Sequence, residues 1–183
     1  MPKRIICLLV ITIVLTFAHS TALSRDRQSI SLVYYPVNQG SNEVQQAFVA
    51  MVKDFVIYSS LLEDVDSSSG YLISLHAKDK DEAINFLSFG FEPQLACDIV
   101  EAYTQWIPGI DKLVIVPCDG IPALTQADYN ECSFYQPNYN SIIFRRSYSG
   151  CYSEQDSYIF TVHLSYVDES WKIEKLELLE SSD

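Results

Sequence analysis

Apolar and polar side chains alternate through the C-terminal part of the chain, which is the pattern of strands with one buried face. In Ser157–Val167 the apolar side chains of one face are Tyr158, Phe160, Val162, Leu164 and Tyr166. Asp168-Glu169-Ser170 predicts a tight turn, and Trp171–Leu179 predicts a second strand with a bulge between Ile173 and Leu176. A hairpin of this kind needs another layer to cover its apolar face.

Helical spacing precedes the hairpin. Asn42 and Gln45 have the spacing of a capping box, and apolar residues then recur at three- and four-residue steps up to a loop at 66–70. These apolar residues are Val44, Phe48, Met51, Val52, Phe55, Leu62 and Val65. We therefore expect a long helix that starts near Asn42 and ends by Asp66.

Two shorter helices should follow. Asp79 and Glu82 have capping-box spacing and predict a helix that continues through Leu87. Pro93 is favoured in the first turn of a helix, and the apolar spacing after it predicts a second short helix that reaches Trp106.

The remaining segments read as strands and one long loop. Tyr71–Ala77 is a short strand or an extended connection, whereas Leu113–Val116 and Ser141–Tyr148 predict strands. Residues 117–140 predict a long irregular stretch. Helices followed by an antiparallel meander predict an α+β fold, with the N-terminal helices packed on a curved antiparallel sheet in a single domain over residues 42–183.

The first 24 residues have the pattern of a secretory signal peptide. Lys3 and Arg4 precede an apolar run from Cys7 to Ala18, and small residues follow it. A membrane-spanning helix needs about 20 apolar residues, so this run is too short for one, although an uncleaved N-terminal anchor is the alternative. We expect a secreted or periplasmic protein with an N-terminal arm over 25–41 and no further membrane span.

Removal of residues 1–24 makes the chain more acidic. The remaining 159 residues hold 10 Lys and Arg against 24 Asp and Glu, a net charge of −14. Nucleic-acid binding needs a basic patch, so this charge argues against such a partner. It suggests a cationic partner or serves only solubility.

Four cysteines remain in the exported chain, Cys97, Cys118, Cys132 and Cys151. An even number in an exported protein favours two disulfides over a zinc site. If the helix from Pro93 and the strand after Asp111 run back along each other, Cys97 reaches Cys118 and leaves Cys132 for Cys151. The competing arrangement closes the loop with a Cys118–Cys132 bond.

The segments YIFTVHLSYVDESWKIEKLELL, FLSFGFEPQLACDIVEAY, KLVIVP and DGIP resemble exported bacterial members of the NTF2-like (cystatin-like) superfamily. The resemblance covers roughly residues 42–180 and rests on patterns of shape. It implies a cone in which helices fill the concavity of a bent sheet, here lined by Phe55, Tyr103, Trp106 and Phe160. Some such members resemble inhibitors of cell-wall endopeptidases, although no inhibitor residue can be carried over to this chain.

His163 is the main candidate for acid–base chemistry. It could act as a general acid or base with Asp119 or Asp128, as histidines do in some NTF2-like enzymes. The alternation places it opposite the apolar face, which favours a surface or hydrogen-bonded strand histidine instead. Asp119, Asp128 and Glu131 lack the spacing of a calcium loop, so we expect no metal and no cofactor.

Ligand-binding candidates are basic and aromatic. Arg145 and Arg146 point to opposite faces of their strand; the inward one could hold a carboxylate or phosphate, or either could pair with Glu174 or Glu177. Tyrosines are concentrated in residues 129–152 and suit peptide or glycan binding. The aromatic candidates are Tyr103, Trp106, Tyr129, Tyr135 and Tyr139.

No nucleophile-elbow, zincin, phosphate-loop or dinucleotide motif occurs in the chain. We therefore expect a non-enzymatic binding domain for an extracytoplasmic protein, peptide or glycan. The alternatives are a small-pocket enzyme of lyase or isomerase type that uses His163 and a carboxylate, an inhibitor of cell-wall endopeptidases, and a domain with a structural role only.

Overall fold

The computed structural model describes residues 32–67, 70–117, 120–150 and 156–181. The chain divides into a unit of residues 1–32 and a unit of residues 33–183, and the described residues belong almost entirely to the second. The predicted signal peptide, Cys118, Asp119 and Cys151 lie outside the described residues.

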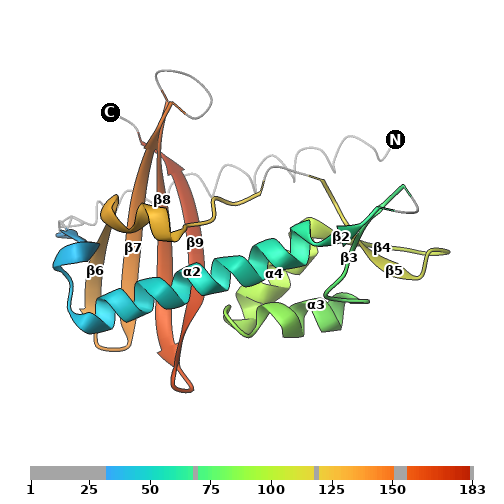
Figure 1. Cartoon of the computed structure of the whole chain (residues 1–183), viewed down its shortest axis with the longest axis horizontal. Helices are drawn as coiled ribbons and strands as arrows, with labels where there is room; N and C mark the ends of the chain where they lie inside the picture. The colour runs from blue at the N-terminus through green and yellow to red at the C-terminus, as the bar shows by residue number, and fades with distance from the viewer. Residues whose placement is uncertain (1–31, 68–69, 118–119, 151–155, 182–183) are drawn as a thin grey trace, which may run out of the picture. The chain divides into compact units, whose positions relative to one another are not determined.

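The larger sheet is antiparallel and has five strands in the order β1-β6-β7-β8-β9 (Figure 1). Its strands are β1 (Tyr35–Pro36), β6 (Cys132–Asn138), β7 (Ser141–Ser149), β8 (Ser157–Val167) and β9 (Ser170–Glu180). The predicted C-terminal hairpin is therefore confirmed. Asp168 and Glu169 make its turn, with φ of 49° and 61°.

The predicted bulge in the last strand is also present. His163 lies opposite Lys175 while Leu164 lies opposite Ile173, so Glu174 is the extra residue on β9. The extra residue restores the alternation after it, because Leu176 then faces the same side of the sheet as Val162.

The described residues contain three α-helices, which lie between β1 and β6 in the sequence: α2 (Asn42–Glu63), α3 (Lys80–Leu87) and α4 (Pro93–Tyr103). Asp79 caps α3 as predicted, since its carboxylate accepts a hydrogen bond from the Glu82 amide at 2.8 Å. The cap of α2 is Ser41 and not Asn42, because the Ser41 hydroxyl accepts from the Val44 amide. The predicted helix therefore forms, but its N-cap lies one residue earlier.

A second, four-stranded sheet was not predicted. It has the order β2-β3-β5-β4 and contains β2 (Val65–Asp66), β3 (Leu72–Ser74), β4 (Thr104–Ile107) and β5 (Lys112–Ile115). Helix α4 ends at Tyr103 because Thr104 is extended, with φ −133° and ψ 154°. Trp106 therefore lies on a strand, opposite Leu113, and not on the helix where the apolar spacing placed it.

The segment predicted as a long irregular loop contains the 3₁₀ helix η3 (Gln126–Asn130) and strand β6. Sequence alternation does not reveal β6, because none of its residues after Cys132 is fully buried and Pro137 lies within it. Long-range pairing with β7 on one side and β1 on the other makes it a strand.

The core lies between α2 and the larger sheet. Phe48 packs edge-on against Phe144 of β7 at a centroid distance of 5.5 Å, and Phe55 packs against Phe160 of β8 at 6.1 Å. All four rings are buried. Aromatic side chains therefore fill the face of the sheet that the alternation predicted to be buried.

The disulfide prediction is not met in the structure. Cys97 of α4 and Cys132 of β6 both carry free thiols, so neither Cys97–Cys118 nor Cys132–Cys151 is formed, and Cys132 does not close the loop with Cys118. Cys132 is buried at the start of its strand, and burial and the neighbouring Asp128 raise the pKa of its thiol to about 12. Cys97 is only half-buried.

The two thiols should differ in reactivity. We expect iodoacetamide at pH 8 to modify Cys97 well before Cys132, because the thiolate is the nucleophile and Cys132 is both buried and protonated. Peptide mapping by mass spectrometry measures the two rates, with the denatured protein as the control in which both react. Equal rates in the folded protein, or a failure of either thiol to react after denaturation without reductant, would contradict the structure.

Candidate functional site

His163 is paired with a carboxylate, but not with Asp128. Its Nε2 lies 2.8 Å from Glu177 Oε2 on the neighbouring strand β9. The pair lies on the face of the sheet opposite Phe160, Val162 and Leu164, where the side chains are not buried against α2. Hydrogen bonds from Lys175 and His163 lower the pKa of Glu177. His163 therefore forms a cross-strand hydrogen bond with Glu177, and the predicted His163–Asp128 acid–base pair is not formed.

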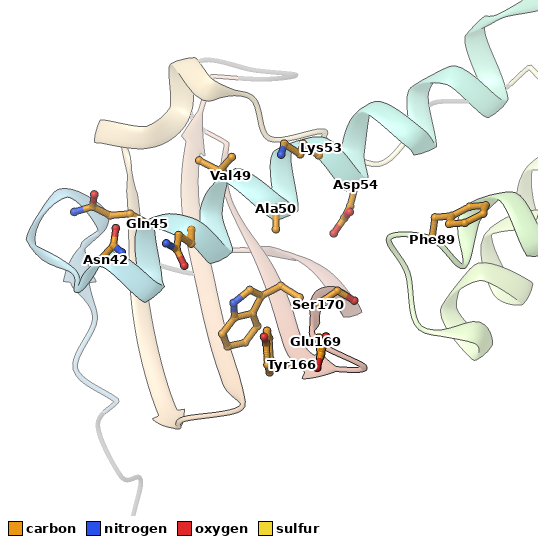
Figure 2. Close-up of a pocket in the computed structure, with 12 residues that line it drawn as sticks. Asn42, Gln45, Val49, Ala50, Lys53, Asp54, Phe89, Tyr166, Glu169 and Ser170 are labelled. Carbon is orange, nitrogen blue, oxygen red and sulfur yellow. The ribbon is translucent and has the colours of Figure 1, made fainter.

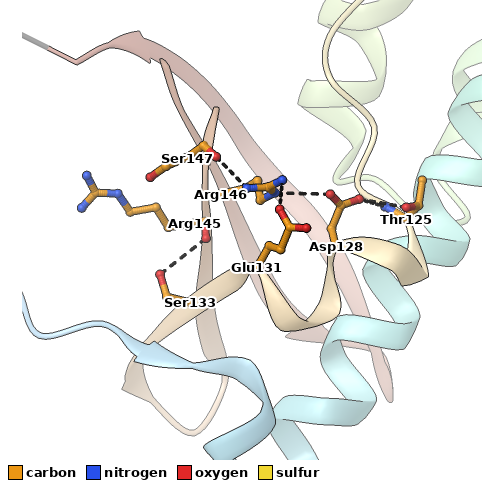
Figure 3. Close-up of polar contacts among 7 residues, drawn as sticks. All are labelled: Thr125, Asp128, Glu131, Ser133, Arg145, Arg146 and Ser147. Carbon is orange, nitrogen blue, oxygen red and sulfur yellow. Dashed lines mark hydrogen bonds and ion pairs between the residues drawn. The ribbon is translucent and has the colours of Figure 1, made fainter. Parts of the chain in front are cut away.

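Arg146 is the inward-facing arginine, and carboxylates of the chain itself hold it (Figure 3). Its Nε lies 3.3 Å from Asp128 Oδ1, and its Nη2 contacts Glu131. Asp128 belongs to η3 and Glu131 follows it, so the arginine ties this segment to β7. The predicted pairing with Glu174 or Glu177 does not occur, because Glu177 lies opposite Thr161 and contacts His163.

Asp128 is held as a carboxylate by the same network. Burial would raise its pKa, but hydrogen bonds from the Thr125 amide and hydroxyl and from Arg146 outweigh burial and lower the pKa. The side chains of Asp128 and Arg146 are each 19% exposed, so solvent screens the pair only in part. Because the guanidinium group of Arg146 is already paired with these carboxylates, its role is structural.

The aromatic candidates do not form one surface. Tyr129 packs edge-on against Phe48 of the core, and Tyr135 packs against Tyr34 at 6.1 Å. Arg145 lies over the ring of Tyr34 at 5.3 Å. Two further candidates are separate from these: Tyr103 packs on Tyr58, and Trp106 is on the smaller sheet. Tyr139, in the β6–β7 turn, is 77% exposed.

An open groove of about 670 Å³ lies beside α2 (Figure 2). The N-terminal half of α2 forms one side, the β8–β9 turn forms another, and Phe89 of the α3–α4 connection lies at one end. Its lining residues are Asn42, Gln45, Gln46, Val49, Ala50, Lys53, Asp54, Phe89, Tyr166, Glu169, Ser170 and Trp171.

Asp54 is the unusual member of this lining. It is 7% exposed, and its Oδ2 is the one buried side-chain nitrogen or oxygen among the described residues that has no hydrogen-bond partner. Burial raises the pKa of Asp54 to about 8, although Lys172 and Lys53 act in the opposite direction. The carboxyl group is therefore mostly protonated at neutral pH.

The close approach of Gly90 contributes to the burial of Asp54. A Cβ at position 90 would lie 2.5 Å from Asp54 Oδ1, so only glycine fits there. Two backbone hydrogen bonds attach the turn around Gly90 to β9. The Ile173 amide donates to the Gly90 carbonyl, and the Glu92 amide donates to the Ile173 carbonyl, both at 2.9 Å. The glycine thus lets the α3–α4 connection cover one side of the carboxyl group.

Sequence reasoning missed Asp54, although a signal for it exists. Asp54 is three residues after Met51 and four before Tyr58, so it lies on the apolar face of the helix. An acidic residue at a core position of an amphipathic helix is uncommon and marks a candidate functional site.

The Asp128 network should make stability depend on acid pH. Its lowered pKa stabilises the fold fully above the carboxyl's ordinary pKa of 3.8, and the contribution disappears as the pH falls through the lowered value. We expect Asp128→Asn to lose about 1–2 kcal/mol at pH 7, measured by urea unfolding. The difference from the wild type should shrink at acid pH, and equal stability at pH 7 would contradict the assigned network.

Asp54 should have the opposite pH dependence. Its pKa is raised from 3.8 to about 8, so folding of the wild type takes up a proton and the stability falls as the pH rises through this range. This loss of unfolding free energy has an upper limit of about 1.4 kcal/mol per pH unit. The stability of Asp54→Asn should therefore rise relative to that of the wild type as the pH increases from 4 to 8. Exposed Glu101→Gln is the control, and parallel stability curves for Asp54→Asn and the wild type would refute the burial of the carboxyl group.

Comparisons with known proteins assign no family. No family model matches the chain, and no match was found among curated proteins. Within the described part of the chain, no three His, Cys, Asp or Glu side chains are grouped so that they could hold a metal ion. None of the helices in that part is long and apolar enough to cross a membrane.

Proposed function

We propose that this protein is an exported, non-enzymatic binding domain and that its ligand occupies the groove beside Asp54. The observation that carries the proposal is the buried Asp54 carboxyl group in the wall of an open groove, whose Oδ2 has no hydrogen-bond partner among the described residues. The signal-peptide pattern of residues 1–24 supports export to a secreted or periplasmic location.

An unpartnered buried carboxyl group lowers the stability of the free protein. Leaving a buried polar group unsatisfied costs roughly 1–3 kcal/mol, and native structures contain few such groups. A ligand that forms a hydrogen bond with Asp54 removes this penalty on binding. The groove volume of about 670 Å³ lies within the range of small-molecule sites, roughly 300–1,000 Å³.

A comparison with another hollow supports this choice. An open hollow of about 700 Å³ lies between α4 and the end of the C-terminal hairpin, and Glu92, Asp98, Glu174 and Lys175 contribute to its lining. Within the described part of the chain, its lining contains no buried side-chain oxygen or nitrogen that lacks a partner. Size alone therefore does not distinguish the Asp54 groove, whereas the unpartnered carboxyl group does.

Binding is favoured over catalysis by the position of His163. The enzyme alternative needs this histidine and a carboxylate in a substrate pocket. Glu177 supplies a carboxylate, but His163 lies on the face of the sheet away from α2 and does not line the Asp54 groove. The NTF2-like cone remains part of the proposal, supported by the long α2 that covers one face of an antiparallel sheet. Inhibition of an endopeptidase would be one form of such binding.

Nuclear magnetic resonance of the purified protein tests the proposal. Panels of neutral, cationic and anionic small molecules are titrated while the backbone amides of the groove are observed, chiefly those of Gln45, Lys53 and Ser170. We expect at least one panel to shift these amides. Asp54→Asn should weaken the binding about tenfold, the effect of one hydrogen bond of about 1.4 kcal/mol, whereas Glu101→Gln should leave it unchanged. Groove amides that no panel shifts would refute the proposal.

A further inference from the structure

We propose that the ligand of the Asp54 groove is an uncharged, polyhydroxylated molecule of the glycan class, with one face on Tyr166 and its hydroxyl groups directed toward α2. This inference rests on the proposed function, because it names the ligand of the same groove. It follows from three properties of the lining: exposed aromatic rings, side-chain amides and a balance of charge.

Aromatic rings are exposed to solvent in the groove (Figure 2). Tyr166 of β8 is 42% exposed and packs against Trp171 of β9 with a centroid distance of 5.1 Å, while Phe89 is 77% exposed. Trp171 holds the Tyr166 ring from one side, so Tyr166 offers a pre-organised apolar surface. The C–H groups on one face of a sugar ring match such a surface, since covering it removes apolar area from water.

Side-chain amides line the groove on the α2 side. Asn42, Gln45 and Gln46 line the groove from the first turns of the helix. Gln45 already donates one hydrogen bond to Gly40 O at 3.3 Å, while Asn42 and Gln46 are exposed. An amide side chain both donates and accepts hydrogen bonds, and so does a hydroxyl group. A ligand with hydroxyl groups along one edge can therefore pair with this row.

Charge in the groove favours neither a cation nor an anion. Apart from Asp54, the charged side chains of the lining are Lys53 and Glu169, which have opposite signs. Lys172 lies near Asp54, but its amino group donates to Ser88 O at 2.9 Å. The raised pKa of Asp54 keeps its carboxyl group mostly neutral at pH 7, and a neutral carboxyl group can also both donate and accept.

An extended peptide fits the groove less well. Peptides that add a strand to a sheet need free backbone groups at its edge. Near the groove this edge belongs to β9, where the amide and carbonyl of Ile173 are already bonded to Gly90 and Glu92. Recognition in the groove therefore depends on side chains, as expected for a ligand that presents hydroxyl groups.

The test titrates five probes, one at a time, into the purified protein while the groove amides are observed by nuclear magnetic resonance. The probes are a glucose oligosaccharide, an N-acetylglucosamine oligosaccharide, a blocked neutral trialanine, and a charged pair of spermidine and citrate. We expect at least one oligosaccharide to shift the amides of Gln45, Lys53 and Ser170. Tyr166→Ala should weaken this binding about tenfold and Tyr166→Phe should retain it, because the ring supplies the contact.

Tyr139→Ala is the matched control, since Tyr139 is exposed in the β6–β7 turn and does not line the groove. The amide spectrum of each variant shows whether it is folded. Shifts caused only by trialanine, spermidine or citrate would overturn the glycan assignment and leave the proposed binding function intact. Groove amides that respond to none of the probes nor to the broader panels would overturn both proposals, and Tyr166→Ala with unchanged oligosaccharide affinity would overturn the assigned geometry.

Discussion

Four phenylalanines hold α2 on the larger sheet, as Phe48 meets Phe144 and Phe55 meets Phe160. Each fully buried phenylalanine contributes roughly 1.5–3 kcal/mol, so these contacts set the position of the helix. Asp54 precedes Phe55 directly, and the packing of that ring therefore places the carboxyl group beside Gly90. The same interaction that builds the core determines where the groove lies and which side chains of α2 line it.

The hairpin, its bulge and the capped helices could be predicted from the sequence because each has a local pattern. Strand β8 was predicted with its observed bounds because its alternation is uninterrupted, and Asp79 was recognised because its capping partner is three residues away. The bulge at Glu174 shows in the sequence as a change of phase between apolar residues. Each of these features depends on contacts between near neighbours or on a repeated pattern, and both are present in a single sequence.

The features that escaped prediction depend on contacts between distant residues. Strand β6 exists because β1 and β7 pair with it, and the partners of Arg146 come from the η3 segment, which reads as a loop. Of the predicted site residues, the structure joins Arg146 to Asp128 and separates His163 from both. The groove was missed because its members come from α2, the α3–α4 connection and the hairpin turn, and no spacing in the sequence relates these segments.

The β8–β9 turn has a consequence for how this protein could evolve. Asp168 and Glu169 both have positive φ, a conformation that costs an L-residue other than glycine roughly 1–2 kcal/mol. Glycine at position 169 would relax the backbone, but it would also delete the carboxylate at the edge of the groove. Hairpin stability and groove charge are thus coupled at position 169, whereas glycine at position 168 would relax the backbone without changing the lining of the groove.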